Sequence, residues 1–511
     1  MILENGVVRT MDASLPVARS LAIAGERIAG GVGPHETALA SPDVVDLGGR
    51  CVLPGFTDSH VHFPKWAIAQ REVRLDGTRS LDEALARVRE AADSVSGGWL
   101  RGRGWRDAEW TSGEPSRAAL DEVTGEIPAA LTARDGHSLW LNSAALTRAD
   151  GDLRVDGGVV ELDNRGEPTG ILREESAWRF EELYARPSDE EYLDAMWPAV
   201  KLAAARGVTA VHDKDGGLGA LRFWQRLGSE GALEFRIWQS LPHERLYELG
   251  ELGIRSSFGN PMLRIGYLKV FMDGTLGSQT ARMLDGSGVE ITSLEELEEI
   301  VRRAAVAGFP VAVHAIGDRA NRDALDAFGA TRRDWQQLGL RQRIEHAQLL
   351  APEDVPRFAE LGIAASVQFS HAPSDRDLAD RLWAGKTDRA YAYRSLRDAG
   401  ALLANGSDAP IEELDPWAGV VAGVLRTLDD RDGWHPEQAL TLQEALEATT
   451  VNPAWLARDE RRRGKLLPGF FADLVVLDRD PFDREPEELR DVQVVATMVG
   501  GVWMHNPPPW D

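Results

Sequence analysis

Short apolar runs alternate with amphipathic segments through the middle of the chain. Eight of these runs predict β-strands, at Val52–Asp58, Val208–His212, Phe235–Leu241, Ile265–Met272, Pro310–Ala315, Arg343–His346, Ile363–Gln368 and Ala401–Ala404. Segments with helical spacing lie between them, at Glu191–Arg206, Leu294–Ala307, Asn321–Phe328, Glu353–Leu361 and Arg389–Ala399. Continuous apolar strands that alternate with helices are typical of a parallel sheet. Because a (β/α)₈ barrel has eight such strands, we predict an α/β protein with a TIM barrel.

Both ends of the chain are rich in short strands instead. Residues 2–10 and 20–29 are β-rich runs broken by Asn5-Gly6 and Gly25, and Asp473–Leu477 and Val492–Trp503 have the same character. Chain termini often lie close together. We therefore expect residues 1–51 and 464–511 to form one small β-sandwich domain, with the barrel spanning residues 52–463.

A long segment separates the first predicted barrel strand from the second. Residues 65–195 hold a strand of their own, Ala129–Arg134, and a tryptophan-rich stretch at residues 98–110. Long insertions on a barrel loop often act as lids over the site. We expect a large lid-like insertion after strand 1, the alternative being a second domain with no role at the site.

Composition and charge indicate which binding partners and which cellular compartment to expect. The 511 residues carry a formal net charge of −25, which disfavours binding to nucleic acid or to an anionic membrane surface. Cys51 is the single cysteine, so an intramolecular disulfide or a cysteine-based zinc site is excluded. Because the sequence shows neither a signal-peptide pattern nor a long apolar span, we expect a cytoplasmic protein.

Metal-ligating side chains recur at the ends of the predicted barrel strands. His60 and His62 follow the first strand, and alternation along a strand puts residues two apart on the same face. Four more such side chains stand at the ends of separate strands, namely Lys269, His314, His346 and Asp408. Because barrel enzymes keep their catalytic groups at the carboxyl ends of the strands, these side chains predict one divalent-metal site.

The residue types suit hydrolysis by a metal-activated water. Imidazole and carboxylate ligands favour zinc, which lowers the pKa of a bound water to about 7. Asp408 could bind the metal and also act as the general base. An ammonium group cannot bind a metal, whereas a neutral Lys269 amine could react with CO₂ to form a carbamate that bridges two ions. We thus expect Zn²⁺, with one ion, or two if Lys269 is carboxylated.

Five segments then identify a family resemblance. In order, GFTDSHVH, YLKVFMD, AVHAIGD, RIEHAQ and NGSDAP resemble the metal-dependent amidohydrolase superfamily. GRGWRDAEW, GVTAVHD, SVQFSHAPSD and LLPGFFADLVVLD are similar to amidohydrolase family 3, the branch that contains N-substituted formamide deformylases. The resemblance covers essentially the whole chain.

The resemblance implies roles for the same side chains and a homo-oligomer as the assembly. The residues that match the superfamily's metal ligands are His60, His62, His314, His346 and Asp408. Lys269 matches the lysine that is carboxylated in binuclear members, and Asp408 inherits the activation of water.

Four further residues are candidates for substrate contact. Trp105 and His137 lie in the insertion, His212 ends a predicted strand, and His371 follows VQFS. Packing within the insertion is the alternative for Trp105, and a structural place beneath the site is the alternative for His212. Because His243 has no strand-end context in this assignment, we expect it to lie outside the site.

The leading hypothesis is hydrolysis of a non-peptide C–N bond in a small-molecule amide, such as an N-acyl or N-formyl amine. A deaminase of an aminated heterocycle is the alternative, against which Lys269 counts because deaminases of the superfamily generally lack the carboxylated lysine. A metal-holding binding protein without catalysis is the third reading. The sequence contains no H-E-x-x-H, G-x-S-x-G or complete phosphate-loop motif, which excludes zincins, the usual serine hydrolases and P-loop ATPases.

Overall fold

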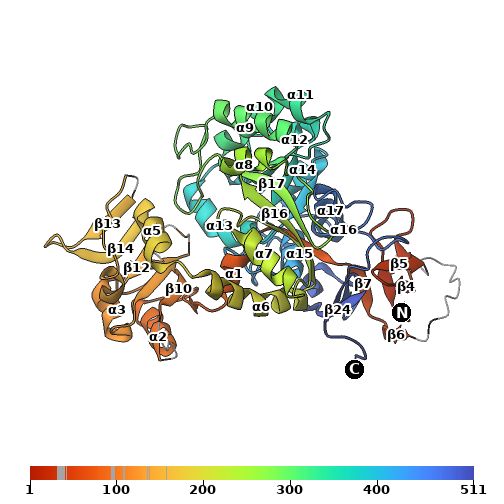
Figure 1. Ribbon diagram of the computed structural model, residues 1–511, viewed down its shortest axis with the longest axis horizontal. Coiled ribbons are helices and arrows are strands. Elements are labelled where there is room, and N and C mark those ends of the chain that lie inside the picture. The colour runs from red at the N-terminus through yellow and green to blue at the C-terminus, as the bar shows by residue number, and fades with distance from the viewer. Residues whose placement is uncertain are drawn as a thin grey trace. The chain divides into compact units, whose positions relative to one another are not determined.

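The computed structural model describes residues 1–30, 41, 43–93, 98–107, 110–134, 136, 138–156 and 158–510. The chain divides into two compact units, which Figure 1 shows. One consists of Met1–Trp66 with Trp197–Asp511, and the other of Ala67–Met196.

The first unit contains the predicted barrel. Eight parallel strands pair in chain order, from β8 (Phe56–Val61) through β15 (Val208–Asp213), β16 (Arg236–Pro242), β17 (Leu263–Phe271), β18 (Val311–Ala315), β19 (Arg343–His346) and β20 (Ala364–Val367) to β21 (Leu403–Asn405). Two backbone hydrogen bonds close the circle: Asp408 N–H donates to the His60 carbonyl at 2.7 Å, and His62 N–H donates to the Ala409 carbonyl at 2.8 Å. The (β/α)₈ fold predicted from the apolar runs is confirmed.

The first predicted strand was wrong in its extent. Val52–Asp58 is two strands, because β7 (Cys51–Pro54) pairs with strands of the terminal domain and only β8 enters the barrel. Gly55 lies between them, and a Cβ atom at this position would approach the Thr209 side chain to 2.1 Å. The chain passes from one sheet to the other where only glycine fits.

Helices pack around the barrel as the spacing predicts, with differences at their ends. Leu294–Ala307 is helix α9, with the Ser293 side chain accepting a hydrogen bond from Glu296 N–H at its start. The other predicted helices appear as α6 (Asp189–Ala205), α10 (Asp318–Ala330), α12 (Val355–Leu361) and α14 (Tyr393–Asp398). Several helices were not predicted, among them α7 (Ala220–Ser229), α15 (Pro416–Leu425) and α16 (Leu442–Thr449). Helix α13 (His371–Leu382) was also not predicted, because its sequence HAPSDRDLADRL has few apolar residues to mark a buried face.

Both chain ends build two sheets with a common core. A four-stranded sheet contains β1 (Ile2–Glu4), β4 (Leu21–Ala24), β5 (Arg27–Gly30) and β6 (Val44–Asp46). A six-stranded sheet contains β2 (Val7–Arg9), β3 (Val17–Ala18), β7, β22 (Leu474–Leu477), β23 (Val494–Val499) and β24 (Val502–His505). Leu3 and Leu21 of the first sheet lie in one buried cluster with Val476 and Met498 of the second. The terminal strands therefore form a sandwich from both ends of the chain.

The second unit has a mixed six-stranded sheet of its own. Its strands are β9 (Val73–Arg74), β10 (Leu100–Trp105), β11 (Ala129–Ala133), β12 (Ser138–Leu141), β13 (Gly158–Leu162) and β14 (Pro168–Glu174). Helices α2 (Leu81–Ala92) and α3 (Arg117–Thr124) supply Ala84, Val88 and Leu120 to its core. The predicted strand Ala129–Arg134 is present as β11.

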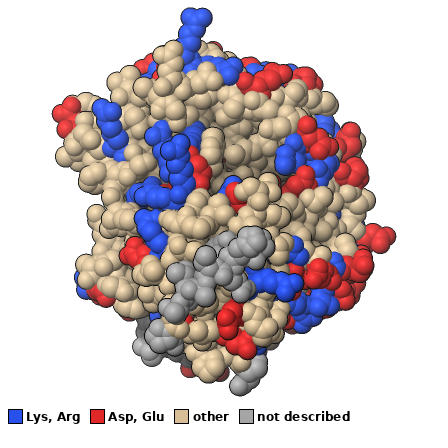
Figure 2. Space-filling view, turned by 90° about the vertical axis from the view of Figure 1, so that its right-hand side faces the viewer, with Lys and Arg blue, Asp and Glu red and all other residues tan. Residues whose placement is uncertain are grey.

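Charged side chains of both signs occupy the face shown in Figure 2, where Lys and Arg lie among Asp and Glu. In the part of the chain that the structure describes, no helix has the length and apolar character needed to cross a membrane.

A buried ion pair at the amino-terminal end of β16 gives a test of stability. Arg236 makes two hydrogen bonds to Asp473, at 2.7 and 2.9 Å, and both side chains are buried. Asp473 also lies 3.4 Å from the buried Arg463, so the variant Asp473→Asn removes the paired carboxylate of Arg236 and a neighbour of a second arginine, which should cost about 3–5 kcal/mol. We expect a clear fall in melting temperature. Asp430→Asn, at a fully exposed partner of Arg490, should leave it unchanged, and equal melting of the two variants would contradict this assignment.

Candidate metal centre

The predicted ligands converge at the carboxyl ends of the barrel strands. His60 is in β8 and His62 follows it, while His314 and His346 come from β18 and β19. The His346 ring centroid lies 4.8 Å from that of His60 and 4.5 Å from that of His314. Asp408 follows β21 and reaches the same group of rings. Tertiary structure thus gathers side chains that are hundreds of residues apart in the sequence.

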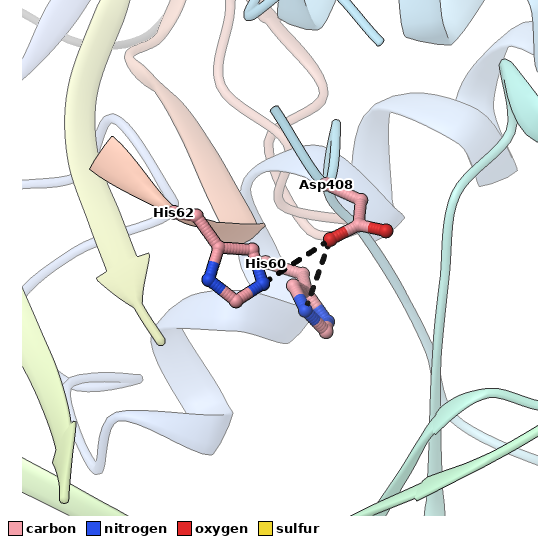
Figure 3. A group of neighbouring side chains, drawn as sticks. All are labelled: His60, His62 and Asp408. Carbon is pink, nitrogen blue, oxygen red and sulfur yellow. Dashed lines mark ion pairs between the residues drawn. The ribbon is translucent and has the colours of Figure 1, made fainter. Parts of the chain in front are cut away.

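His60, His62 and Asp408 form one close group of donors (Figure 3). Asp408 Oδ1 lies 3.3 Å from His60 Nε2 and 3.5 Å from His62 Nε2. Donors about 2.0–2.1 Å from a tetrahedral zinc are separated by about 3.3 Å, so this spacing fits a shared metal ion. His60 Nε2 is also buried and has no hydrogen-bond partner among the described residues. Donor chemistry and geometry therefore both fit a divalent cation.

Backbone geometry at the strand ends turns these side chains inward. Asp408 has φ 56° and His346 has φ 72°, both in the left-handed region that side-chain-bearing residues seldom occupy. Gly406 lies two residues before Asp408, and a Cβ atom on it would lie 2.3 Å from the backbone nitrogen of His60. Asp58 accepts hydrogen bonds from the backbone N–H groups of His60 and Ser407. The close approach of β8 to the β21 turn thus depends on a glycine and a buried carboxylate.

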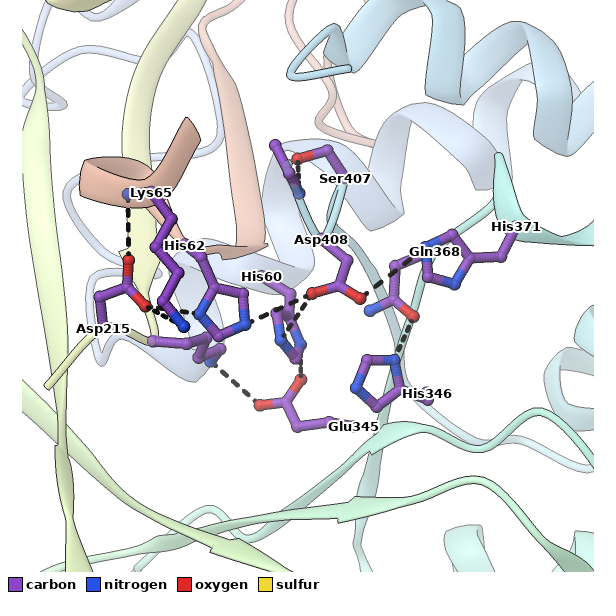
Figure 4. A network of polar contacts seen from close by, with 12 residues as sticks. His60, His62, Lys65, Asp215, Glu345, His346, Gln368, His371, Ser407 and Asp408 are labelled. Carbon is purple, nitrogen blue, oxygen red and sulfur yellow. Dashed lines mark hydrogen bonds and ion pairs between the residues drawn. The ribbon is translucent and has the colours of Figure 1, made fainter. Parts of the chain in front are cut away.

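Each histidine ring is held through the nitrogen that faces away from the group (Figure 4). The Nδ1 atoms of His60, His62 and His346 lie 2.9, 2.7 and 2.9 Å from Glu345, Asp215 and Gln368. His314 is held by Nε2, which lies 3.1 Å from the Gly274 carbonyl. Metal-binding histidines are commonly oriented in this way. The arrangement leaves Nε2 of three rings and Nδ1 of His314 available for a ligand.

Burial favours the neutral imidazole at His60, His314 and His346, which is the form that binds metal. Desolvation holds the pKa values of His60 and His346 well below the usual range and lowers the pKa of His314 to about 3. Burial also raises the pKa of Asp408, against the opposing effect of the nearby His62 and His371. A bound cation favours the ionised carboxylate, so it would offset this cost of burial.

Lys269 lies on the inward side of β17 at the same end of the barrel. It is buried, and its Nζ atom stands 4.8 Å from the centre of the Phe271 ring, which itself lies 5.2 Å from the His314 ring. Burial lowers the pKa of the lysine, against the effect of Glu345 and Asp408. The surroundings therefore favour the neutral amine that carboxylation needs.

The four expected substrate contacts have different surroundings. His371 begins α13, where its Nδ1 accepts from the Gln348 amide at 3.2 Å and its Nε2 lies 3.9 Å from Asp408 Oδ2. His212 is buried and accepts from Arg343 at 3.1 Å. Trp105 is buried in the core of the second unit and donates to the Leu131 carbonyl. His137 lies outside the described residues.

The sequence assignment missed several residues around the ligands. Glu345, Asp215 and Gln368 orient the rings. Glu345 and Gln368 lie within the predicted strands Arg343–His346 and Ile363–Gln368, and Asp215 follows Val208–His212 by three residues. His243 was placed outside the site, yet it directly follows β16 and its Nδ1 lies 3.3 Å from the Lys269 carbonyl. Because β16 ends at Pro242, one residue beyond the predicted strand, His243 also stands at the end of a barrel strand, and this position could have marked it as a site residue.

Two sets of donors have ligand atoms within 4.8 Å of one another in the described part of the chain. One set is His60, His62 and Asp408, and the other is His346, His371 and Asp408. Asp408 belongs to both, so its two oxygens face different histidines.

Comparison with known proteins agrees with this site. The amidohydrolase family profile matches residues 43–505. The chain is 32% identical to Protein LONG AFTER FAR-RED 3 of Arabidopsis thaliana, over 98% of this chain and 91% of the relative. It is 30% identical to the N-substituted formamide deformylase of Arthrobacter pascens, over 98% and 97%.

A solved structure of similar sequence supports the same conclusion. An uncharacterized metal-dependent hydrolase from Pyrococcus horikoshii superposes with a TM-score of 0.81 at 29% identity, covering 95% of this chain and 99% of the other. With the family profile matching most of the chain and the barrel gathering the expected donors, the protein belongs to the amidohydrolase family, in the branch that includes the N-substituted formamide deformylase, and is a metal-dependent hydrolase.

Proposed function

We propose that the protein hydrolyses a non-peptide C–N bond in a small amide, such as an N-acyl or N-formyl amine. The observation that carries the proposal is the placement of Asp408. One carboxylate oxygen faces His60 and His62 at 3.3 and 3.5 Å, and the other faces His371 at 3.9 Å. The similarity to a formamide deformylase over nearly the whole chain supports this class of substrate.

The residues that would hold a metal are His60, His62, His314, His346 and Asp408. Zinc suits their nitrogen and oxygen donors, and a second ion would need the carbamate of Lys269. When bound, such an ion activates water and polarises a carbonyl oxygen. The buried Lys269 amine supports a site with two ions.

The protein's own groups would then move the proton and orient the amide. Asp408 takes a proton from the attacking water and returns it to the leaving nitrogen, so that amide and water become acid and amine. His371 Nε2 is buried and has no hydrogen-bond partner among the described residues, so it is placed to donate to the developing oxyanion. His212 supports the floor of the site through Arg343.

Metal content gives the first test. Protein purified without chelator or added metal should contain about two zinc-like ions per chain if Lys269 is carboxylated, and about one if it is not. His62→Asn should lower the content, because it removes a donor from the group that His60, His62 and Asp408 form. His435→Asn is the control, since this ring pairs with Glu437 outside the site. A protein that neither holds nor rebinds metal would refute the proposal.

Removal of the base gives the second test. Asp408→Asn should lower kcat/KM for an N-formyl or N-acyl amine by at least about 10²-fold, the usual contribution of a general base. The melting temperature should change little because the amide is isosteric. Asp430→Asn, at an exposed carboxylate, should retain full activity. Unchanged turnover in Asp408→Asn would refute its role, and ammonia release from heterocycles without amide cleavage would point to a deaminase.

A further inference from the structure

The buried carboxylate of Glu345 holds the His60 ring through Nδ1. Glu345 Oε2 accepts a hydrogen bond from His60 Nδ1 at 2.9 Å. Its other oxygen, Oε1, forms ion pairs with Lys214 Nζ at 3.0 Å and with Arg343 Nε at 2.8 Å. The side chains of Glu345, Lys214 and Arg343 are completely buried. Both oxygens of the carboxylate are therefore in use, and Glu345 is not free to bind a metal itself.

This cluster spans the interior of the barrel. His60 comes from β8 and Lys214 directly follows the adjacent strand β15, whereas Glu345 and Arg343 belong to β19. Three strands separate β15 from β19 along the sheet in one direction, and β20 and β21 separate β19 from β8 in the other. The carboxylate therefore joins opposite walls of the barrel under the candidate metal centre.

Aromatic and imidazole groups surround the two cations. The Arg343 guanidinium lies 4.3 Å from the centre of the Tyr267 ring, and Lys214 Nζ lies 5.9 Å from the same ring. Arg343 also donates to His212 Nδ1 at 3.1 Å. These neighbours carry no negative charge, and among the described residues Glu345 is the carboxylate within ion-pair distance of the two cations. With each group in its ordinary ionised form, Lys214, Arg343 and Glu345 carry a formal net charge of +1, and all three are shielded from water.

We propose that Glu345 is a positioning residue that sets the metal affinity of the site. It holds the proton of His60 on Nδ1. The lone pair of Nε2 is then free for the metal position that His60 shares with His62 and Asp408. It also cancels one of two buried cations that would otherwise repel a divalent ion. The inference rests on the proposed function, because it concerns the same metal centre.

The wild type and three variants distinguish the effect of the net charge of this cluster from the effect of its hydrogen bond to His60. Glu345→Gln keeps an acceptor for His60 but raises the net charge of the cluster to two. Lys214→Met lowers it to zero, and the double variant Lys214→Met/Glu345→Gln returns it to one. Each protein is stripped of metal and titrated with zinc against a competing chelator, without substrate.

We expect Glu345→Gln to bind zinc about 10–100-fold more weakly, the usual effect of losing a partner of a metal-binding histidine. Lys214→Met should bind at least as tightly as the wild type. The double variant should bind zinc more tightly than Glu345→Gln and within about tenfold of the wild type, because its net charge is that of the wild type. If Glu345→Gln alone does not fold, an affinity of the double variant within tenfold of the wild type supports the proposal, and a greater loss overturns it.

A buried ion pair elsewhere provides the matched control. Asp473→Asn also removes a buried carboxylate from an arginine, so it should lower the melting temperature but leave zinc affinity unchanged. Zinc affinity of Glu345→Gln within twofold of the wild type would overturn the inference, as would a double variant no better than Glu345→Gln. Failure of the wild type to bind zinc would instead refute the proposed function, so the two failures are distinguishable.

Discussion

Closure of the barrel between β8 and the turn after β21 is the constraint on which the site depends. Hydrogen bonds from Asp408 N–H to the His60 carbonyl and from His62 N–H to the Ala409 carbonyl join the first and last strands. They set the three donors His60, His62 and Asp408 within one ligand sphere. Gly406 permits the approach, since any side chain there would meet the backbone of His60. Without this closure, the two histidines and the aspartate would belong to opposite edges of an open sheet.

Burial imposes the second condition on the same residues. Desolvation lowers the pKa values of His60, His314 and His346, and each ring of the site relies on one acceptor to hold its orientation. Glu345, Asp215 and Gln368 fill that role at three rings. The carboxylates among them carry charge into the interior, and Lys214 and Arg343 balance Glu345. The donors facing the metal and the charges behind them thus form one electrostatic unit.

Hydrophobic patterning was sufficient to predict the fold because parallel barrel strands are buried on both faces. Leu294–Ala307 was predicted to the residue, since its apolar face repeats regularly and Ser293 marks its start. Two predictions were less successful for identifiable reasons. The apolar run around Gly55 continues through two different sheets, and periodicity does not distinguish them. Helix α13 is largely polar, so its sequence lacks the repeat that marks a helix.

The sequence by itself determined the (β/α)₈ class, the family, and which side chains stand at strand ends, because apolar period and ligand-type residues are local properties of the chain. The side chains behind the ligands were decided only by tertiary structure. Glu345 is one residue from His346, yet it serves His60 across the barrel. Its partner Lys214 comes from yet another strand end. Such pairings depend on which strand ends face one another when the sheet closes. The spacing of residues along the sequence does not indicate these contacts.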